Sequence, residues 1–121
     1  MLQIGTAFLA CEESGTSPQH REAVLSGKAG KTARTRGFTG RLARGIKNQL
    51  LDTMSAPDVE ILPYPLQRYL MQSVSGPAEK ACQPERIPLW SGQSANLARH
   101  TKATELLDAL VSGVSALGEG K

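Results

Sequence analysis

Residues 2–9 read LQIGTAFL, and their interpretation decides what kind of fold the chain can form. The residues Leu2–Ile4 predict a short β-strand, and Gly5 and Thr6 predict the turn that ends it. A single strand cannot form a sheet, because its backbone N–H and C=O groups need partners from neighbouring strands. The chain is therefore either a helical bundle with an irregular start or a piece of a fold whose sheet continues elsewhere.

Amphipathic helices are expected behind this strand. Ser17 and Pro18 predict a helix over residues 18–26, since a serine caps a helix well and a proline suits its first turn. Residues 28–40 lack a helical stripe and are expected to be extended or irregular. The expected fold class is thus mainly α, with one short strand and four or five helices. Apolar residues at helical spacing predict three later helices, with stripes at Leu42, Ile46, Leu50, Leu51 and Met54, before Pro57; at Leu66, Tyr69, Leu70 and Val74, up to Gly76-Pro77; and at Leu106, Leu107, Leu110, Val111, Val114 and Leu117.

Composition limits the size and class of the protein. The 121 residues suffice for one domain, but only 40% are hydrophobic and 4% aromatic, so we expect a thin core. The sequence shows no signal peptide and no apolar run long enough to cross a bilayer, so we expect a soluble cytoplasmic protein with no membrane contact. Cys11 and Cys82 lack the spacing of a metal site, which predicts free, buried thiols and no bound metal.

The positive charge of the chain is concentrated in one stretch. The formal net charge is +3, and residues 23–51 contain seven of the 14 cations and no acidic residue. Such a stretch either follows a nucleic-acid backbone or forms a solvated basic face. Because Phe38 is the only aromatic residue within it and no recognition motif is present, we favour the solvated face and do not expect nucleic acid as a partner.

Two short stretches have a chemical interpretation. At the carboxyl end of a barrel strand, Gln3-Ile4-Gly5-Thr6 would allow close backbone approach and supply a hydroxyl donor to a phosphate. Trp90-Ser91-Gly92-Gln93-Ser94-Ala95 combines a large ring, a glycine and an amide, and is either a ligand contact or a helix-capping turn. His20 and His100 have no acidic or cysteine residues arranged beside them, so neither is expected to be a catalytic base or a metal ligand.

Four segments carry a resemblance to a known family. They are QIGTAFLACEESGTSPQHREAVLSG (residues 3–27), TRGFTGRLARGIKN (35–48), ILPYPLQRYLM (61–71) and PLWSGQSANLAR (88–99). In this order and spacing they resemble the carboxyl-terminal third of the bacterial nitronate monooxygenases, long called 2-nitropropane dioxygenases. The resemblance implies an FMN-dependent TIM-barrel enzyme with an appended helical domain, which oxidises alkyl nitronates with dioxygen to carbonyl compounds and nitrite.

The resemblance also implies roles for particular residues. Leu2–Ile4 would be the last barrel strand, and the family's catalytic histidine lies upstream of the matching region, so no catalytic residue is expected here. The implied FMN contacts are Gln3, Ile4, Gly5 and Thr6 at the phosphate, and Gly92 and Gln93 in the family's GQ motif. The implied domains are residues 1–27 (last strand, phosphate turn and following helix), 28–90 (helical or irregular appended region) and 91–121 (GQ motif and last helix).

Three hypotheses for the function remain open. The chain is a fragment of a nitronate monooxygenase, inactive by itself; a helical interaction module that has lost the chemistry; or a small basic nucleic-acid-binding protein. The first hypothesis explains the isolated strand, the thin core and the ordered motifs together. It further predicts exposed apolar faces and self-association through them.

Overall fold

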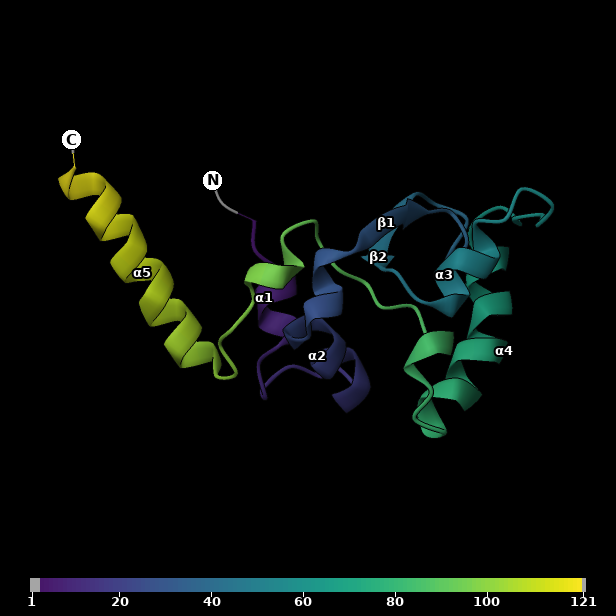
Figure 1. Cartoon of the computed structure of the whole chain (residues 1–121), viewed down its shortest axis with the longest axis horizontal. Coiled ribbons are helices and arrows are strands. Elements are labelled where there is room, and N and C mark those ends of the chain that lie inside the picture. Colours follow the sequence, from purple (N-terminus) through teal and green to yellow (C-terminus); the bar gives the residue numbers. More distant parts are fainter. Residues whose placement is uncertain (1–2, 121) are drawn as a thin grey trace.

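The structure is a computed structural model that describes residues 3–120 of the chain. These residues form five α-helices and one two-stranded antiparallel sheet (Figure 1). The mainly helical class is confirmed. The elements are α1 (Thr6–Leu9), α2 (Pro18–Leu25), β1 (Thr32–Thr35), β2 (Ala43–Ile46), α3 (Gln49–Met54), α4 (Leu66–Lys80) and α5 (Ala103–Glu119), with 3₁₀ turns at Gly27–Gly30, Pro84–Arg86 and Ala95–Leu97. Strand β1 lies within residues 28–40, which were expected to be extended or irregular, whereas β2 lies where a helix was predicted.

The predicted strand at the start of the chain is not formed. Leu2 lies outside the described residues, and Gln3 and Ile4 have no regular secondary structure. Helix α1 begins at Thr6, directly after Gly5, where only a turn was predicted. The physical reason is that a strand needs hydrogen-bond partners, and no strand among residues 3–120 lies beside this segment to satisfy its backbone groups.

The β1–β2 hairpin is the largest departure from the predicted fold. Thr35 pairs with Ala43 and Thr32 with Ile46, so the helix predicted to begin at Leu42 is wrong for the stretch that forms β2. In this stretch, pairing with distant segments outweighs the helical spacing of the apolar residues, since β2 pairs with β1 on one side and a third segment, at residues 89–90, joins it as well. The amide of Ile46 donates to the Leu89 carbonyl at 2.8 Å, and the next residue, Trp90, forms an antiparallel bridge with Gly45.

Capping side chains fix where the first helices begin. The Ser17 hydroxyl accepts from the His20 amide at 3.4 Å, which confirms the predicted start of α2. The buried Asn48 accepts from the Leu51 amide at 2.9 Å, so α3 begins after it rather than at residue 42. The same Asn48 side chain donates to the carbonyls of Pro84 and Ile87 at 2.9 and 2.8 Å and ties α3 to the later turn.

The core is thin, as the composition predicts. One cluster gathers Val24, Ile46 and Leu89 with several alanines, and a second packs Phe38 against Leu50, Leu51 and Met71. The second cluster is completed by Gln67, which is fully buried. Its amide donates to the Gly37 carbonyl at 2.8 Å and accepts from the Leu62 amide at 3.0 Å. Both ends of this buried amide are therefore satisfied, as burial requires.

Two predicted apolar stripes do not face the core. Helix α4 continues past Pro77 to Lys80, and its stripe at Leu66, Tyr69, Leu70 and Val74 is exposed, while Gln67, Met71 and Ala78 form the inner face. In α5 only Leu106 is buried. Figure 1 shows α5 projecting away from the other elements and attached at its N-terminal end. Among residues 3–120, no helix has both the length and the apolarity needed to cross a lipid bilayer.

Candidate functional site

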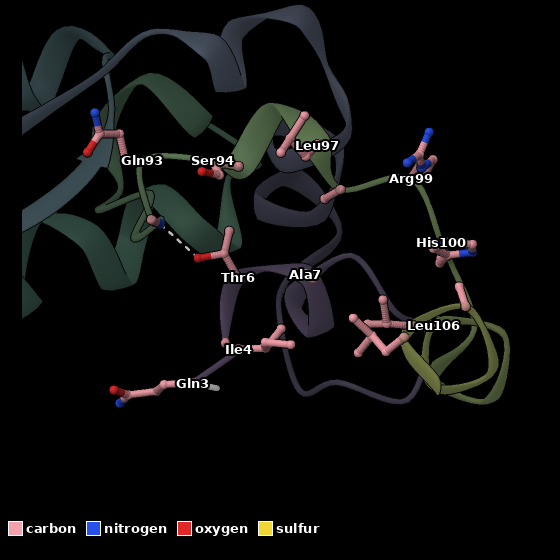
Figure 2. A pocket seen from close by; sticks show the side chains of 16 residues that line it. Gln3, Ile4, Thr6, Ala7, Gln93, Ser94, Leu97, Arg99, His100 and Leu106 are labelled. Carbon is pink, nitrogen blue, oxygen red and sulfur yellow. Dashed lines mark hydrogen bonds between the residues drawn. The ribbon is translucent and has the colours of Figure 1, made fainter. Parts of the chain in front are cut away.

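A cavity of about 510 Å³ lies between the start of the chain and the segment that follows Trp90 (Figure 2). Residues 3–7 form one wall, residues 92–100 form another, and one side of α5 closes a third. The structure thus brings together all six residues that were predicted to contact FMN, although the two groups are far apart in sequence. These residues are Gln3, Ile4, Gly5, Thr6, Gly92 and Gln93.

One hydrogen bond joins the two predicted segments. The Gly92 amide donates to the Thr6 hydroxyl at 2.7 Å across 86 residues of sequence, as the dashed line in Figure 2 shows. A β-carbon at position 92 would lie 3.2 Å from that hydroxyl oxygen, so a larger residue would press on the contact. Glycine at this position therefore allows the Gly92 backbone to approach the Thr6 side chain closely.

The hairpin holds the GQ motif in place. Beside the bridge to Gly45, the Ser91 amide donates to the Arg44 carbonyl at 3.2 Å, which continues the pairing along β2. The Trp90 ring packs edge-on against Phe38, with ring centroids 5.1 Å apart. A β-carbon at Gly45 would lie 2.9 Å from Phe38, so this position must remain small. The motif thus depends on the same core cluster as the hairpin.

His20 supports the same segment from α2. Its Nε2 lies 2.9 Å from the Trp90 carbonyl oxygen. A carbonyl can only accept, so Nε2 carries the hydrogen and donates it. Burial lowers the pKa of His20, and the Trp90 carbonyl and the Glu79 carboxylate partly oppose that shift. His20 therefore holds the backbone before Gly92, and its Nε2 is already occupied.

Arg99 and His100 line the cavity although the sequence pattern did not assign them to it. His100 lies in the loop before α5. The loop is held by Cys11, whose thiol donates to the His100 carbonyl at 3.7 Å, and by Glu13, whose carboxylate accepts from the Ala103 amide at 2.9 Å. These contacts span about 90 residues, so no local signal in the sequence indicates them.

The two cysteines differ, contrary to the prediction that both are buried. Cys11 is buried and Cys82 is exposed, and both are free. Burial raises the pKa of the Cys11 thiol, and the nearby Glu13 carboxylate raises it further. Cys11 therefore remains a protonated structural residue beneath the cavity wall. Within residues 3–120, no three side chains of the His, Cys, Asp and Glu types are grouped to hold a metal ion.

The cavity presents donors suited to an anion. The amides of Thr6 and Ala7 open α1 and so have no partner inside the helix. A β-carbon built on Gly5 meets no atom within 4 Å, which leaves the backbone there open to a ligand. Arg99 adds a positive charge at the opposite wall, and Figure 2 shows Ile4 and Leu106 pointing toward one another between the walls. The site combines donors at one end with apolar sides.

A second cavity, of about 730 Å³, is lined by residues of α2 and α4 and by Trp90. His20 and Arg68 lie at its wall, and neither was assigned to a site from the sequence. Tyr64 also contributes, with the Arg41 guanidinium 4.0 Å from its ring centroid. Because its lining residues come from distant parts of the chain, sequence spacing alone does not indicate this cavity.

Several residues of the basic stretch have partners within the protein. Lys28 lies 3.6 Å from the Glu85 carboxylate, and Lys47 lies 3.9 Å from that of Asp52. Arg44 donates to the Thr32 hydroxyl at 3.0 Å across the hairpin. These side chains contribute to the folded surface of the hairpin and its neighbours.

Comparison with known proteins identifies the relatives of this chain. The profile of the nitronate monooxygenase family matches residues 1–113. A probable nitronate monooxygenase of Staphylococcus haemolyticus (strain JCSC1435) is 40% identical over 116 residues, which are 96% of this chain and 32% of the relative. A probable nitronate monooxygenase of Staphylococcus aureus (strain Newman) is 34% identical over 120 residues, which are 99% of this chain and 34% of the relative.

A solved structure shows the same fold. The crystal structure of nitroalkane oxidase from Streptomyces ansochromogenes superposes with a TM-score of 0.88 at 33% identity, over 98% of this chain and 34% of that one. The chain thus spans about a third of the length of the relatives it matches. Because the family profile covers nearly all of its residues, the chain belongs to the nitronate monooxygenase family.

Proposed function

We propose that the cavity between residues 3–7 and 92–100 binds the phosphate end of FMN, as one part of an enzyme that oxidises alkyl nitronates with dioxygen. The observation that carries this proposal is the convergence of the Gln3–Thr6 segment and Gly92-Gln93 on one cavity, where Thr6 and Gly92 are hydrogen-bonded. Membership of the nitronate monooxygenase family supports the reaction class.

The residues at the cavity fit a phosphate. A phosphate binds to backbone amides at a glycine turn, to hydroxyl groups and to cationic side chains. The open backbone at Gly5 and the first amides of α1 supply the backbone donors, Thr6 supplies a hydroxyl, and Arg99 supplies a positive charge at the opposite wall. The Thr6 hydroxyl accepts from Gly92 and keeps its own hydrogen for donation to the ligand. FMN bound there would supply the electron-accepting ring that nitronate oxidation requires.

The chain is proposed to hold the cofactor without performing catalysis alone. His20 uses its Nε2 to hold Trp90, and His100 belongs to the loop that closes the cavity. The assignment of residues 2–4 to the last strand of a TIM barrel, the division at residues 27 and 90, and the nitronate and dioxygen substrates belong to this proposal as well. In that arrangement Gln3 and Ile4 would gain strand partners from the rest of the barrel.

Comparing FMN with riboflavin tests the phosphate site, because the two differ only in the phosphate. Flavin fluorescence or equilibrium dialysis would give both dissociation constants for the chain. We expect FMN to bind roughly ten-fold more tightly than riboflavin, a difference of about 1.4 kcal/mol. Because few donors act without an enclosing pocket, both affinities should be low, and the purified chain should carry no flavin colour and turn over no nitronate. Equal dissociation constants for FMN and riboflavin would contradict the proposed phosphate site.

Two glycines allow a matched pair of variants. A side chain at Gly5 or at Gly15 meets no atom within 4 Å, so both substitutions should leave the fold intact. Gly5→Val would place its side chain where the phosphate approaches and should abolish the preference for FMN over riboflavin. Gly15→Val, which lies outside the first cavity, should retain that preference. If Gly15→Val lost it equally, the effect would not come from the proposed site.

A further inference from the structure

Strand β1 is the outer strand of the hairpin (Figure 1). Its neighbour β2 is paired on both sides, with β1 on one side and with residues 89–91 on the other. On that second side the Ile46 amide donates to the Leu89 carbonyl at 2.8 Å. The Arg44 carbonyl accepts from the Ser91 amide at 3.2 Å. Within residues 3–120, β1 therefore has a strand partner on one side only.

The backbone groups of Thr32 and Arg34 face the open edge of β1. Successive residues of an antiparallel strand direct their backbone N–H and C=O groups to opposite edges. Arg44 and Ile46 direct theirs toward residues 89–91, so the residues opposite them, Arg34 and Thr32, direct theirs away from β2. In the described part of the chain, no segment outside the hairpin forms a hydrogen bond with these two backbone units. The edge thus offers free donors and acceptors at strand spacing.

Positive charge lies along the same edge. Arg34 is directly opposite Arg44 in the register, and like charges in this position repel one another. Lys31 precedes β1 and Arg36 follows it, and both side chains are exposed, as is that of Arg34. No carboxylate of residues 3–120 lies within ion-pair distance of these three exposed cations. Their charge is therefore not neutralised within the described chain.

The two faces of the hairpin differ, and only one of them is covered. Ala33 and Ala43 pack against the core cluster around Phe38. Because side chains alternate along a strand, Thr32 and Arg34 point to the opposite face. A strand added beside β1 would therefore meet the arginines without displacing a residue of the core.

We propose that β1 binds an extended acidic peptide of a partner protein as an additional antiparallel strand. The peptide backbone bonds to Thr32 and Arg34, and carboxylates at every second position lie beside the arginines. Charge argues against a second copy, since two β1 edges would place cations against cations. Nucleic acid is disfavoured because its phosphate backbone has no N–H donors for the free carbonyls. The proposal does not depend on FMN binding.

A peptide that alternates glutamate with valine, capped at both ends, is the probe for this edge. It is titrated into the ¹⁵N-labelled chain at low ionic strength, and hydrogen exchange is followed by NMR. On saturation, exchange at the amides of Thr32 and Arg34 should slow by roughly ten-fold or more, because they gain partners. Unchanged exchange at both amides would overturn the proposal, since the cations would then only keep other strands away.

Backbone methylation of the peptide distinguishes strand pairing from simple charge attraction. In the proposed pairing the glutamates lie opposite Thr32 and Arg34 and exchange both hydrogen bonds with them, whereas the valine amides point outward. N-methylation of the glutamate amides should weaken binding by roughly ten-fold or more. N-methylation of the valine amides leaves the charge and the pairing edge unchanged and should have little effect. Equal effects of the two methylation patterns would contradict strand addition.

A charge reversal locates the carboxylates of the peptide. Arg34→Glu should weaken binding of the glutamate peptide by roughly ten-fold and strengthen binding of a lysine–valine peptide. Arg86→Glu, in the 3₁₀ turn Pro84–Arg86, makes the same change in net charge and is the control. Both arginines are exposed, so both variants should fold as the parent does. Equal weakening by the two variants would mean that binding follows net charge alone and would contradict a site at β1.

The rival occupants are tested with the same two amides. An oligothymidylate that displaces the glutamate peptide from Thr32 and Arg34 and binds more tightly would assign the edge to nucleic acid. Slow exchange that develops with increasing chain concentration, without any peptide, would assign it to a second copy. Binding of the glutamate peptide in the absence of both effects supports the proposal.

Discussion

The centre of the molecule and its last helix are stabilised in opposite ways. At the centre, Phe38 is 1% exposed and packs on Trp90, and the buried side chains of Asn48 and Gln67 each bind more than one backbone group. The 17 residues of α5 bury only Leu106. The first region has the buried side chains of a folded core, and the second has the apolar pattern of a core helix, although most of its apolar side chains are exposed among residues 3–120.

The difference explains why the cavity is formed on two sides and open on the third. The hairpin sets Trp90 and Gly92, and Gly92 in turn contacts Thr6, so those walls follow from the central core. The third wall belongs to α5, whose position is fixed only at its start. The proposed ligand site is therefore pre-organised at its donor end and open at its apolar end.

The largest loss of stability is expected for a substitution at the centre of the molecule. Phe38→Ala removes the ring that fills the second core cluster and supports Trp90. We expect the free energy of unfolding to fall by about 3–5 kcal/mol, measured by urea denaturation followed by circular dichroism. Leu42→Ala, at a residue that is 52% exposed beside the hairpin, is the control and should change little. A loss below about 1 kcal/mol for Phe38→Ala would show that the centre is not a packed core.

A pair of adjacent leucines compares the two sides of α5 directly. Leu106 is 6% exposed and Leu107 is 50% exposed. Leu106→Ala should lower the free energy of unfolding by about 2 kcal/mol or more, because it leaves a cavity against the body of the protein. Leu107→Ala should remain within about 0.5 kcal/mol of the parent in the same denaturation experiment. Equal losses would mean that α5 is packed on both sides and that the contrast between the regions is wrong.

A smaller effect is expected at the contact between the cavity walls. Thr6→Val removes the acceptor of the Gly92 amide and should cost about 1 kcal/mol. Hydrogen exchange at Gly92 should accelerate, while exchange within β1 and β2 should not change. Thr53→Val, at an exposed residue of α3, is the matched substitution and should leave Gly92 exchange unaltered. Unchanged exchange at Gly92 in Thr6→Val would show that the bond does not hold the two segments together.

The smallest effect is a pH dependence from His20. Burial lowers its pKa below the ordinary value of 6.5, so the unfolded chain binds the proton more readily than the folded one. Stability should therefore fall as the pH decreases through 6.5 toward the lowered pKa, and His20 should contribute no pH dependence above that range. His20→Gln keeps a donor for the Trp90 carbonyl and should flatten this part of the profile, measured by thermal unfolding from pH 7.5 to 5.5. An unchanged profile would assign the dependence to another group.

Local signals in the sequence predict the helices better than the contacts between distant segments. Ser17 marks the start of α2 because a cap acts on its immediate neighbours. Such local signals do not predict the hairpin, since Gly45 belongs to a strand through its pairing with Ala33, 12 residues earlier, and its bridge to Trp90, 45 residues later. The apolar stripe of α4 is real, but which side of the helix faces the core is decided by the buried Gln67.

The candidate site was predicted in part. Gly5, Thr6, Gly92 and Gln93 were identified through the family resemblance, and the structure adds that the two pairs line one cavity. Arg99 and His100 were missed because their position depends on contacts with residues 11–13, which no spacing rule connects to them. Distant contacts of this kind must be seen in three dimensions.

Mapping of FMN onto the backbone amides tests most directly whether the two distant segments form one phosphate site. The ¹⁵N-labelled chain is titrated with FMN, and chemical-shift changes are followed along the described residues. The changes should concentrate at Gly5, Thr6 and Ala7 and, in parallel, at Gly92 and Gln93, with the same apparent dissociation constant in both segments. Changes confined to one segment, or centred on the basic hairpin at Arg34 and Arg44, would contradict a site built from both.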